Sequence, residues 1–379
     1  MIYFDYNATS PLKPAVIEAM LPFYRDFYGN PSSLHRFGRI ARDAVERARE
    51  QVAEVTGATP SQIVFTSGGT ESNNLAIRGL ADRFAAGAIL AGPIDHPSVL
   101  EPVKALATKG WSITWLRVND QGIVCDDSLE SAIDSEFRFA SCMIANNETG
   151  VIQDIPSIAA RLREKNIPFH CDGVQALGKI ALDFQALGIA FLSVSAHKIG
   201  GPKGAGALVI DKSVGLEALF RGGAQEHGLR VGTENVAAIV GFGAAAEIAA
   251  RDLEKNTEHL NILRKQLEQG LKKLGSLILF SEQARRVPNT VMFGIHGIDG
   301  EMMVMELDRK GIAVSSGAAC SSQSAEASHV LLAMGIPEEV ARTAVRVSLG
   351  PENTASQVDR FLSEVNRIRS AAQLKATVY

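Results

Sequence analysis

The segment QIVFTSGGTESNNLAI, residues 62–77, decides the fold. It begins as a short β-rich run, turns at Gly68, Gly69 and Thr70, and ends as the start of a helix. A glycine turn between a strand and a helix presents unpaired backbone N–H groups and a hydroxyl to an anion such as phosphate. The segment lacks the lysine of a P-loop and the GxGxxG pattern of a dinucleotide fold, so a nucleotide is the weaker candidate.

Short β-rich runs alternate with amphipathic helices from about Ile63 to Ile210. After the opening QIVFTS, these runs are AIL, SITWLRV, FASCMIA, IPFHCD, AFLSVS and AGALVI. The alternation predicts an α/β fold with a mostly parallel sheet and helices on both faces. A packing helix that ends at Gly57 is predicted before it, because one apolar stripe runs through Ala41, Val45, Ala48, Val52 and Val55.

The rest of the chain repeats the alternation on a smaller scale. After Gly232 a helical stretch runs through EIAARDLEKN and LRKQLEQGLKKL, and strand-like runs follow, up to a final helix near Gln357–Arg369. We therefore predict a large domain at residues 13–252. Residues 1–12 and 253–379 are predicted to form a small α+β domain that carries the Cys320 loop.

Composition excludes several classes of protein. The 379 residues are 46% hydrophobic and 21% charged, which is typical of a globular chain. A net charge of −4 gives no general attraction to nucleic acid or to an anionic membrane. MIYFDYNATS does not resemble a signal peptide, and the longest apolar segment, Val236–Ala246, is far shorter than the ~20 residues that span a bilayer. We expect a soluble cytoplasmic protein that binds neither nucleic acid nor membrane.

Two strand ends carry groups suited to chemistry. AFLSVS leads into SAHKIGGPKG, which places Ser195, His197 and Lys198 at a strand end. A buried lysine near other positive groups becomes neutral enough to attack a carbonyl, whereas the alternative is a solvated turn with surface lysines.

The strand IPFHCD ends in Asp172, and Gln175 follows three residues later. An aspartate at this end of a strand points into the ligand crevice, where a protonated pyridine nitrogen would partner it; the alternative is a helix cap. His96 could stack on a flat ring, although lone loop histidines are more often structural.

Cys320 differs from the other three cysteines. The stretch SSGAACSSQSAEASHV surrounds it with small, polar, turn-prone residues, which favours an exposed nucleophile over a buried thiol. Cys142 and Cys171 lie in strand-like runs and are predicted to be buried small hydrophobes. With Cys125 included, the spacing indicates neither a metal site nor a disulfide framework.

Six motifs, taken in order, resemble those of the cysteine desulfurases, which are class V members of the fold type I enzymes that depend on pyridoxal 5'-phosphate (PLP). They are FTSGGTESNNLAI, IANNETG, HCDGVQALGK, SAHKIGGPKG, VGTENV and SSGAACSS. The resemblance covers essentially the whole chain. It implies a fold type I PLP-dependent transferase, with the large domain and the smaller α+β domain described above.

The resemblance also implies cofactor-binding roles. Lys198 would hold PLP covalently, Asp172 would pair with its pyridine nitrogen, and Gln175 would contact its phenolic oxygen. His96 would stack on the ring and take part in catalysis. Asn147 would also hold the cofactor. The phosphate of PLP would be bound by Gly69, Thr70, Ser195, His197 and, from a neighbouring subunit, Thr233.

The implied substrate is L-cysteine, with Arg346, Asn147 and Asn7 as the candidate substrate-binding residues. Its sulfur would pass to Cys320 as a persulfide and leave L-alanine. A homodimer is implied, together with an acceptor protein for iron–sulfur cluster, thio-cofactor or tRNA synthesis. No resident metal is expected, although Cys320 could transiently ligate an iron–sulfur cluster with a partner.

Three alternatives stay open at this point. A selenocysteine lyase, or another class V lyase or aminotransferase, would use Lys198 and PLP without depending on Cys320. A non-catalytic scaffold that keeps the fold for protein binding is the third.

Overall fold

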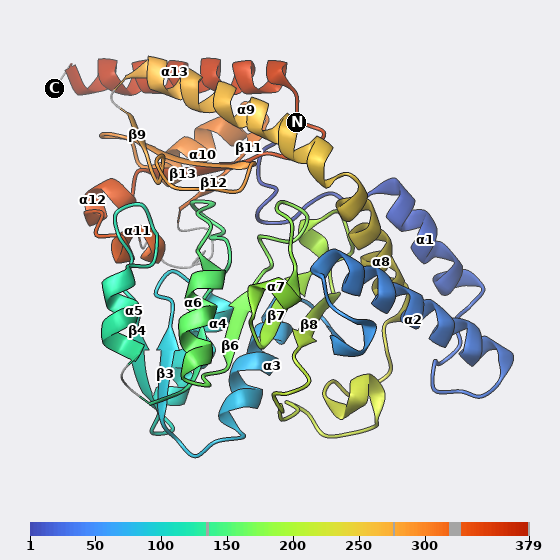
Figure 1. The fold of residues 1–379 in the computed structure, drawn as a ribbon. Helices are drawn as coiled ribbons and strands as arrows, with labels where there is room; N and C mark the ends of the chain where they lie inside the picture. Colours follow the sequence, from blue (N-terminus) through green and yellow to red (C-terminus); the bar gives the residue numbers. More distant parts are fainter. Residues whose placement is uncertain (134–135, 276, 318–326, 378–379) are drawn as a thin grey trace.

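The computed structural model describes residues 1–133, 136–275, 277–317 and 327–377. Its main sheet has seven strands, with helices packed around it (Figure 1). Strand β8 is antiparallel to both of its neighbours, and the other adjacent pairs are parallel. The predicted mostly parallel α/β sheet is therefore confirmed. In order across the sheet, the strands are β2 (Ile63–Thr66), β8 (Gly206–Ile210), β7 (Phe191–Ser195), β6 (Phe169–Asp172), β5 (Phe137–Ser141), β3 (Ala88–Ala91) and β4 (Ser112–Trp115).

Both faces of this sheet are covered, as β2 illustrates. Ile63 and Phe65 pack into the cluster that includes α2 and α8, whereas Val64 packs into the cluster that includes α3 and α4. Because both faces of the strand are covered, its first three residues are all apolar, and only Thr66 at its end is polar. The helices of this part are α1 (Pro14–Arg25), α2 (Arg36–Thr56), α3 (Gly69–Ala81), α4 (Pro97–Ala107), α5 (Asp126–Ile133), α6 (Ile155–Glu164), α7 (Phe184–Leu187) and α8 (Val236–Arg251), with short 3-10 turns at 60–62, 196–198 and 225–228.

The second part of the fold is an antiparallel sheet of four strands, beneath the long helices α9 and α13 (Figure 1). Its apolar cluster joins Leu267, Phe293 and Phe361 from three different elements. The strands run in the order β12 (Ser315–Ser316), β13 (Ala344–Ser348), β10 (Thr290–Ile295) and β9 (Leu277–Leu279). The helices are α9 (Leu253–Leu274), α10 (Gly300–Asp308), α11 (His329–Ala333), α12 (Glu338–Ala341) and α13 (Ala355–Thr377).

The start of the chain joins this second part. Strand β1 (Ile2–Tyr3) pairs in parallel with β11 (Ile312–Ala313), and the buried Phe4 ring lies 5.8 Å from that of Phe361. The apolar cluster around Phe361 therefore contains residues from both ends of the chain. The division into residues 13–252 and residues 1–12 with 253–379 stays a prediction, and the break between α8 and α9 at Asp252 agrees with it.

Cys142 and Cys171 are buried as predicted, and burial raises the pKa of both thiols well above the usual range. Cys320 lies outside the described residues. In the described ranges, every helix is too short or too polar to cross a membrane.

A buried ion pair and a backbone hydrogen bond fix the turn around Glu226 to α2 and β2. Arg49 Nη2 lies 2.7 Å from Glu226 Oε1, and the backbone N–H of Phe65 donates to Glu226 Oε2 at 2.8 Å. Arg49 also lies over the Phe65 ring, with its Cζ 4.9 Å from the centroid. Glu226 adopts a left-handed φ of 45°, which a glutamate rarely does, so these contacts must hold it there.

Replacing Glu226 with glutamine is expected to lower the free energy of unfolding by about 3 kcal/mol, because the buried Arg49 charge then lacks its partner. Urea denaturation measures this difference. Glu217→Gln is the matched control, since Glu217 pairs with Arg83 and Arg221 at the exposed surface and should lose less than about 1 kcal/mol. Equal losses in the two variants would contradict the structural role assigned to Glu226.

Candidate functional site

A cavity of about 330 Å³ opens beyond the carboxyl ends of β6 and β7, where ligands bind in α/β sheets. Thr233 does not line it and is exposed elsewhere, and Cys320 lies outside the described residues. The structure brings together the other eleven, which are Asn7, Gly69, Thr70, His96, Asn147, Asp172, Gln175, Ser195, His197, Lys198 and Arg346.

One end of the cavity is the glycine turn before α3. Gly68 has φ 151°, a backbone region that favours glycine, and a Cβ on Gly69 would lie 2.7 Å from Val174 Cγ2. The first N–H groups of α3 have no partner within the helix. Beside them the Ser195 hydroxyl is buried and has no hydrogen-bond partner among the described residues. An orphan donor next to a helix start fits a bound phosphate.

A chain of hydrogen bonds connects Asp172 with His96. The Asp172 carboxylate is buried and accepts from the Val174 N–H (2.9 Å) and from Asn73 Nδ2 (2.8 Å). Asn73 Nδ2 also lies 2.8 Å from the Ser98 hydroxyl, which in turn lies 2.7 Å from His96 Nδ1. The carboxylate is thereby held in one orientation.

The same contacts define the protonation of His96. The backbone N–H of Ser98 donates to His96 Nδ1 at 3.1 Å, so Nδ1 is an acceptor and the ring proton belongs on Nε2. Burial lowers the pKa of His96, and Lys198 and His329 act in the same direction. A neutral imidazole at this place is suited to stacking on an aromatic ring.

Lys198 and His197 approach the cavity from the short turn after β7. Lys198 Nζ donates to the backbone oxygens of Asn7 (2.6 Å) and Ala8 (2.8 Å). His197 Nδ1 lies 3.2 Å from the Thr9 hydroxyl, and burial, followed by the nearby Lys198 and Lys203 charges, lowers the pKa of His197 to about 4. Residues near the start of the chain therefore help to position the reactive lysine.

Arg346, from β13, closes the cavity from the second part of the fold. Its Nη2 lies 2.7 Å from Asp5 Oδ1, and its Nη1 donates to the Asn147 backbone oxygen at 3.1 Å. Arg346 Nε is buried and has no partner among the described residues. An arginine with a donor to spare is suited to a carboxylate.

Asn7 is more deeply embedded than a substrate contact requires. Its Nδ2 donates to the Asn147 backbone oxygen (3.0 Å) and to Thr290 Oγ1 (2.9 Å), while its Oδ1 accepts from Lys179 (2.7 Å) and Asn289 (3.1 Å). These four contacts use the full capacity of the amide. A role of Asn7 in binding substrate stays a prediction.

Sequence reasoning missed several residues of the site: Asp5, Asn73, Ser98 and Lys179. The motifs contain Asn73 and Lys179 but not Asp5 or Ser98. The spacing of these residues carries no signal, because each contacts a partner that only the fold brings close. Among the described residues no cluster of three or more His, Cys, Asp or Glu side chains could hold a metal ion.

His170 lies buried in the sheet, two residues before Asp172 on β6. Its ring nitrogens contact the hydroxyls of Ser141 (2.9 Å) and Ser193 (3.0 Å). Burial lowers the pKa of His170 to about 3. The native state therefore holds this ring neutral.

His170→Gln should lose part of the acid sensitivity of the wild type. The unfolded state takes up a proton near pH 6.5 and the native state only near pH 3, so His170 destabilises the native state progressively as pH falls between these values. From pH 7 to pH 5 the stability advantage of the wild type over the variant should shrink by about 2 kcal/mol. Urea denaturation at both pH values measures the change. Burial raises the pKa of Asp95 to about 8, so Asp95 stabilises the native state as pH falls. This opposite effect is present in both the wild type and His170→Gln, and it cancels when their stabilities are compared.

The groups around the cavity fit PLP. The α3 turn and the Ser195 hydroxyl suit its phosphate, the Asp172 carboxylate suits its ring nitrogen, and Lys198 suits its aldehyde. The volume of about 330 Å³ lies within the roughly 300–1,000 Å³ of small-molecule sites.

Comparisons with known proteins agree with this geometry. The aminotransferase class-V family model matches residues 2–361. Cysteine desulfurase IscS of Dictyoglomus turgidum is 42% identical over 97% of this chain and 94% of its own. A NifS-like protein from Rickettsia africae has a TM-score of 0.90 at 35% identity, covering 98% of this chain and 99% of its own. SspA, solved in complex with cysteine, has a TM-score of 0.81 at 34% identity, covering 93% of this chain and all of its own.

The chain belongs to the aminotransferase class-V family, whose fold and cofactor are those of the PLP-dependent transferases. Within that family it is one of the PLP-dependent cysteine desulfurases, as its relatives over nearly the whole chain are. This membership favours a cysteine desulfurase over a lyase, an aminotransferase or a scaffold.

Proposed function

We propose that the protein takes the sulfur of L-cysteine onto Cys320 and releases L-alanine. The observation that carries this proposal is one cavity that unites Lys198, Asp172 and Arg346 in a cysteine desulfurase chain. That the relative SspA was solved in complex with cysteine supports this amino acid as the substrate.

The residues that line the cavity have different roles in this reaction. PLP, when bound, supplies an aldehyde that captures an amine and a ring that withdraws electrons from the substrate Cα. Lys198 would anchor it, remove the proton from the substrate Cα and return a proton to the product, while Asp172, fixed by Asn73 and Val174, would keep the ring nitrogen protonated. The Arg346 guanidinium binds the substrate carboxylate, with Nε as its available donor.

The sulfur-transfer step then needs a thiolate. Cys320 Sγ attacks the substrate sulfur and the substrate S–Cβ bond breaks; the electron pair stays with Cβ, which takes up a proton to become the methyl group of alanine. The transferred sulfur remains on Cys320 as a persulfide.

The described residues that flank this segment lie beside the cavity, which supports the assignment. Before it, β12 pairs with β13 at Arg346. After it, Ser328 Oγ donates to Glu148 Oε2 at 2.5 Å and His329 Nε2 lies 3.1 Å from the Asp95 backbone oxygen. Glu148 and Asp95 adjoin the cavity residues Asn147 and His96.

The decisive experiment incubates the purified protein with PLP and L-cysteine, measures sulfide and alanine together, and maps the persulfide by mass spectrometry. Cys320→Ser is expected to form alanine about 100-fold more slowly and to carry no persulfide. Cys125→Ser, which removes a partly exposed thiol, is the control and should match the wild type. An unchanged rate in Cys320→Ser would instead support a lyase, and comparison with selenocysteine would identify a selenium enzyme.

A homodimer with shared sites is part of the proposal. Thr233 is exposed and away from the cavity of its own chain, as a residue that reaches a neighbour's phosphate would be. Light scattering should therefore give twice the 40.5 kDa chain mass. A monomer of full activity would contradict the role of Thr233.

The sulfur acceptor and the cytoplasmic location rest on the sequence and its resemblance. We propose an iron–sulfur scaffold protein or a carrier for thio-cofactor or tRNA synthesis as the acceptor. Transient ligation of a cluster by Cys320 with such a partner stays a prediction.

A further inference from the structure

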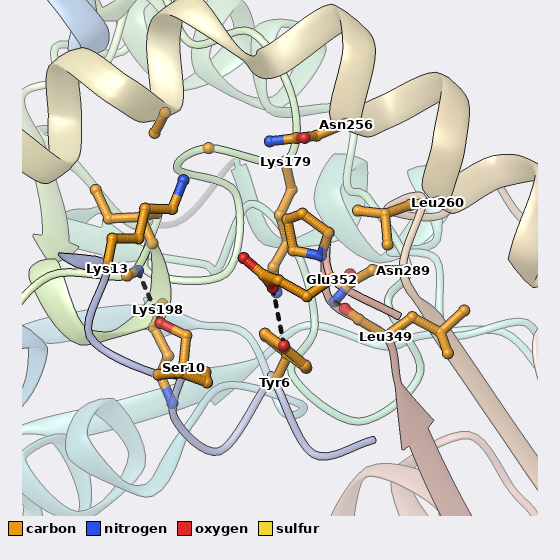
Figure 2. A pocket seen from close by; sticks show the side chains of 16 residues that line it. Tyr6, Ser10, Lys13, Lys179, Lys198, Asn256, Leu260, Asn289, Leu349 and Glu352 are labelled. Carbon is orange, nitrogen blue, oxygen red and sulfur yellow. Dashed lines mark hydrogen bonds between the residues drawn. The ribbon is translucent and has the colours of Figure 1, made fainter. Parts of the chain in front are cut away.

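Lys179 is a buried lysine that the reaction described above does not use. It follows β6 in the turn that also contains Gln175, and only 7% of it is exposed. It lines a second, smaller chamber of about 60 Å³ on whose wall Lys198, Tyr6 and Glu352 also lie (Figure 2).

The contacts of Lys179 are those of a neutral amine. Its Nζ donates to Asn7 Oδ1 at 2.7 Å and to Gln175 Oε1 at 2.5 Å, both of which are uncharged amide oxygens. Burial lowers the pKa of Lys179 well below its usual range, and the cations Lys198 and Arg346 lower it further. A neutral amine has two N–H groups, so two oxygen acceptors satisfy its donors completely.

These contacts determine which way the Gln175 amide faces. With Oε1 bound to Lys179, Gln175 Nε2 donates to the Asn7 backbone oxygen at 3.0 Å. Lys198 Nζ donates to the same oxygen at 2.6 Å. In the opposite orientation, Gln175 Oε1 would face the Asn7 backbone oxygen, so two acceptors would meet, and Lys179 would lose its oxygen acceptor. The Gln175 donor is therefore held on the side of the reactive lysine.

We propose that Lys179 is a positioning residue that holds the N–H₂ group of Gln175 toward the cavity, where it donates to the phenolic oxygen of PLP. This inference rests on the proposed function, because it requires PLP in the cavity. A donor to that oxygen stabilises its ionised form and lowers the pKa of the proton that the oxygen shares.

The test follows the visible absorption band of the PLP-loaded protein as a function of pH. Lys179→Met removes both N–H groups at similar length, so Gln175 loses its fixed orientation and the pH midpoint of the band should rise by about one unit. Gln175→Met should raise it by a similar amount. If Lys179 acts through Gln175, the double variant should match Gln175→Met alone to within about 0.3 units.

A contribution of Lys179 as a charge predicts a different result. The removal of a positive charge would raise the midpoint in the Gln175→Met background as well, and additive shifts would overturn the proposal. An unchanged midpoint in Lys179→Met, with only a lower melting temperature, would also overturn it, since this is the outcome of a purely structural role.

Lys179→Gln is the conservative control, because its uncharged amide can still donate to one of the two acceptors. Its midpoint should return to within about half a unit of the wild type. If Lys179→Met does not fold, Lys179→Leu takes its place in the same comparison. As a second readout, equilibrium dialysis should show about tenfold weaker PLP binding in both Lys179→Met and Gln175→Met.

The two levels of the proposal fail differently. A wild-type protein that stays colourless with PLP would refute the proposed function before Lys179 is tested. A coloured wild-type protein, combined with an unchanged pH midpoint of the absorption band in Lys179→Met, would refute only the positioning role.

Discussion

Replacing Lys198 with alanine is expected to abolish the visible absorption of the protein with PLP and to slow alanine formation from cysteine by about 10⁴-fold. The reason is that a single amine performs two tasks, covalent attachment of the cofactor and proton transfer at the substrate Cα. Lys179, also close to the cavity, is directed to Asn7 and Gln175 and is not placed to substitute for it. An absorption spectrum and a chromatographic assay for alanine measure both effects.

Lys203→Ala is the matched control for this variant, since Lys203 is exposed and follows Lys198 by five residues in the same glycine-rich turn. It should keep the band and a rate close to that of the wild type. A coloured, active Lys198→Ala protein would remove Lys198 from the reaction and leave the cavity without its proposed nucleophile.

Replacing Asp172 with alanine should lower the rate of alanine formation by about 10³-fold, and weaker PLP binding should accompany the loss. A buried carboxylate that pairs with a cationic ring nitrogen contributes about 3–5 kcal/mol when its partner would otherwise remain charged and unpaired. Asp172 is only 4% exposed, and its two donors, Asn73 and the Val174 N–H, hold it in place without competing for every lone pair. Steady-state kinetics at saturating PLP separates the rate effect from the binding effect.

Two further variants provide a smaller perturbation and a control for this prediction. Asn73→Ala removes one hydrogen bond from the Asp172 carboxylate and should cost about tenfold. Asp183→Ala removes an exposed carboxylate that caps α7, and it should leave the kinetics unchanged. If Asp172→Ala behaved like Asp183→Ala, the ring nitrogen would need another partner.

Much of the site was predictable because its parts are local in sequence. The apolar runs identified the strands of the main sheet, and parallel strands bring their carboxyl ends to one edge, so Asp172 and the Ser195–Lys198 turn had to meet there. Several strand boundaries differed; β5, for example, ends at Ser141, although the apolar run continues to Ala145. The run continues because the residues after the strand are buried too, and burial alone does not distinguish a strand from the segment that follows it.

What the sequence by itself determined is the set of chemical groups and the strand ends that carry them: the glycine turn, Asp172, Lys198 and the order of the motifs. Only the tertiary structure decided how these groups are held. The chain start pairs with β11, Asp5 meets Arg346, and Lys179 meets Asn7 across more than 170 residues. Such contacts depend on how two parts of the fold pack together, and a hydrogen bond between remote residues leaves no periodic pattern in either segment. The glycine turn before α3 shows both sides: the φ of Gly68 and the close contact of Gly69 with Val174 require glycine, but the unpaired Ser195 hydroxyl beside the turn is visible only in the folded chain.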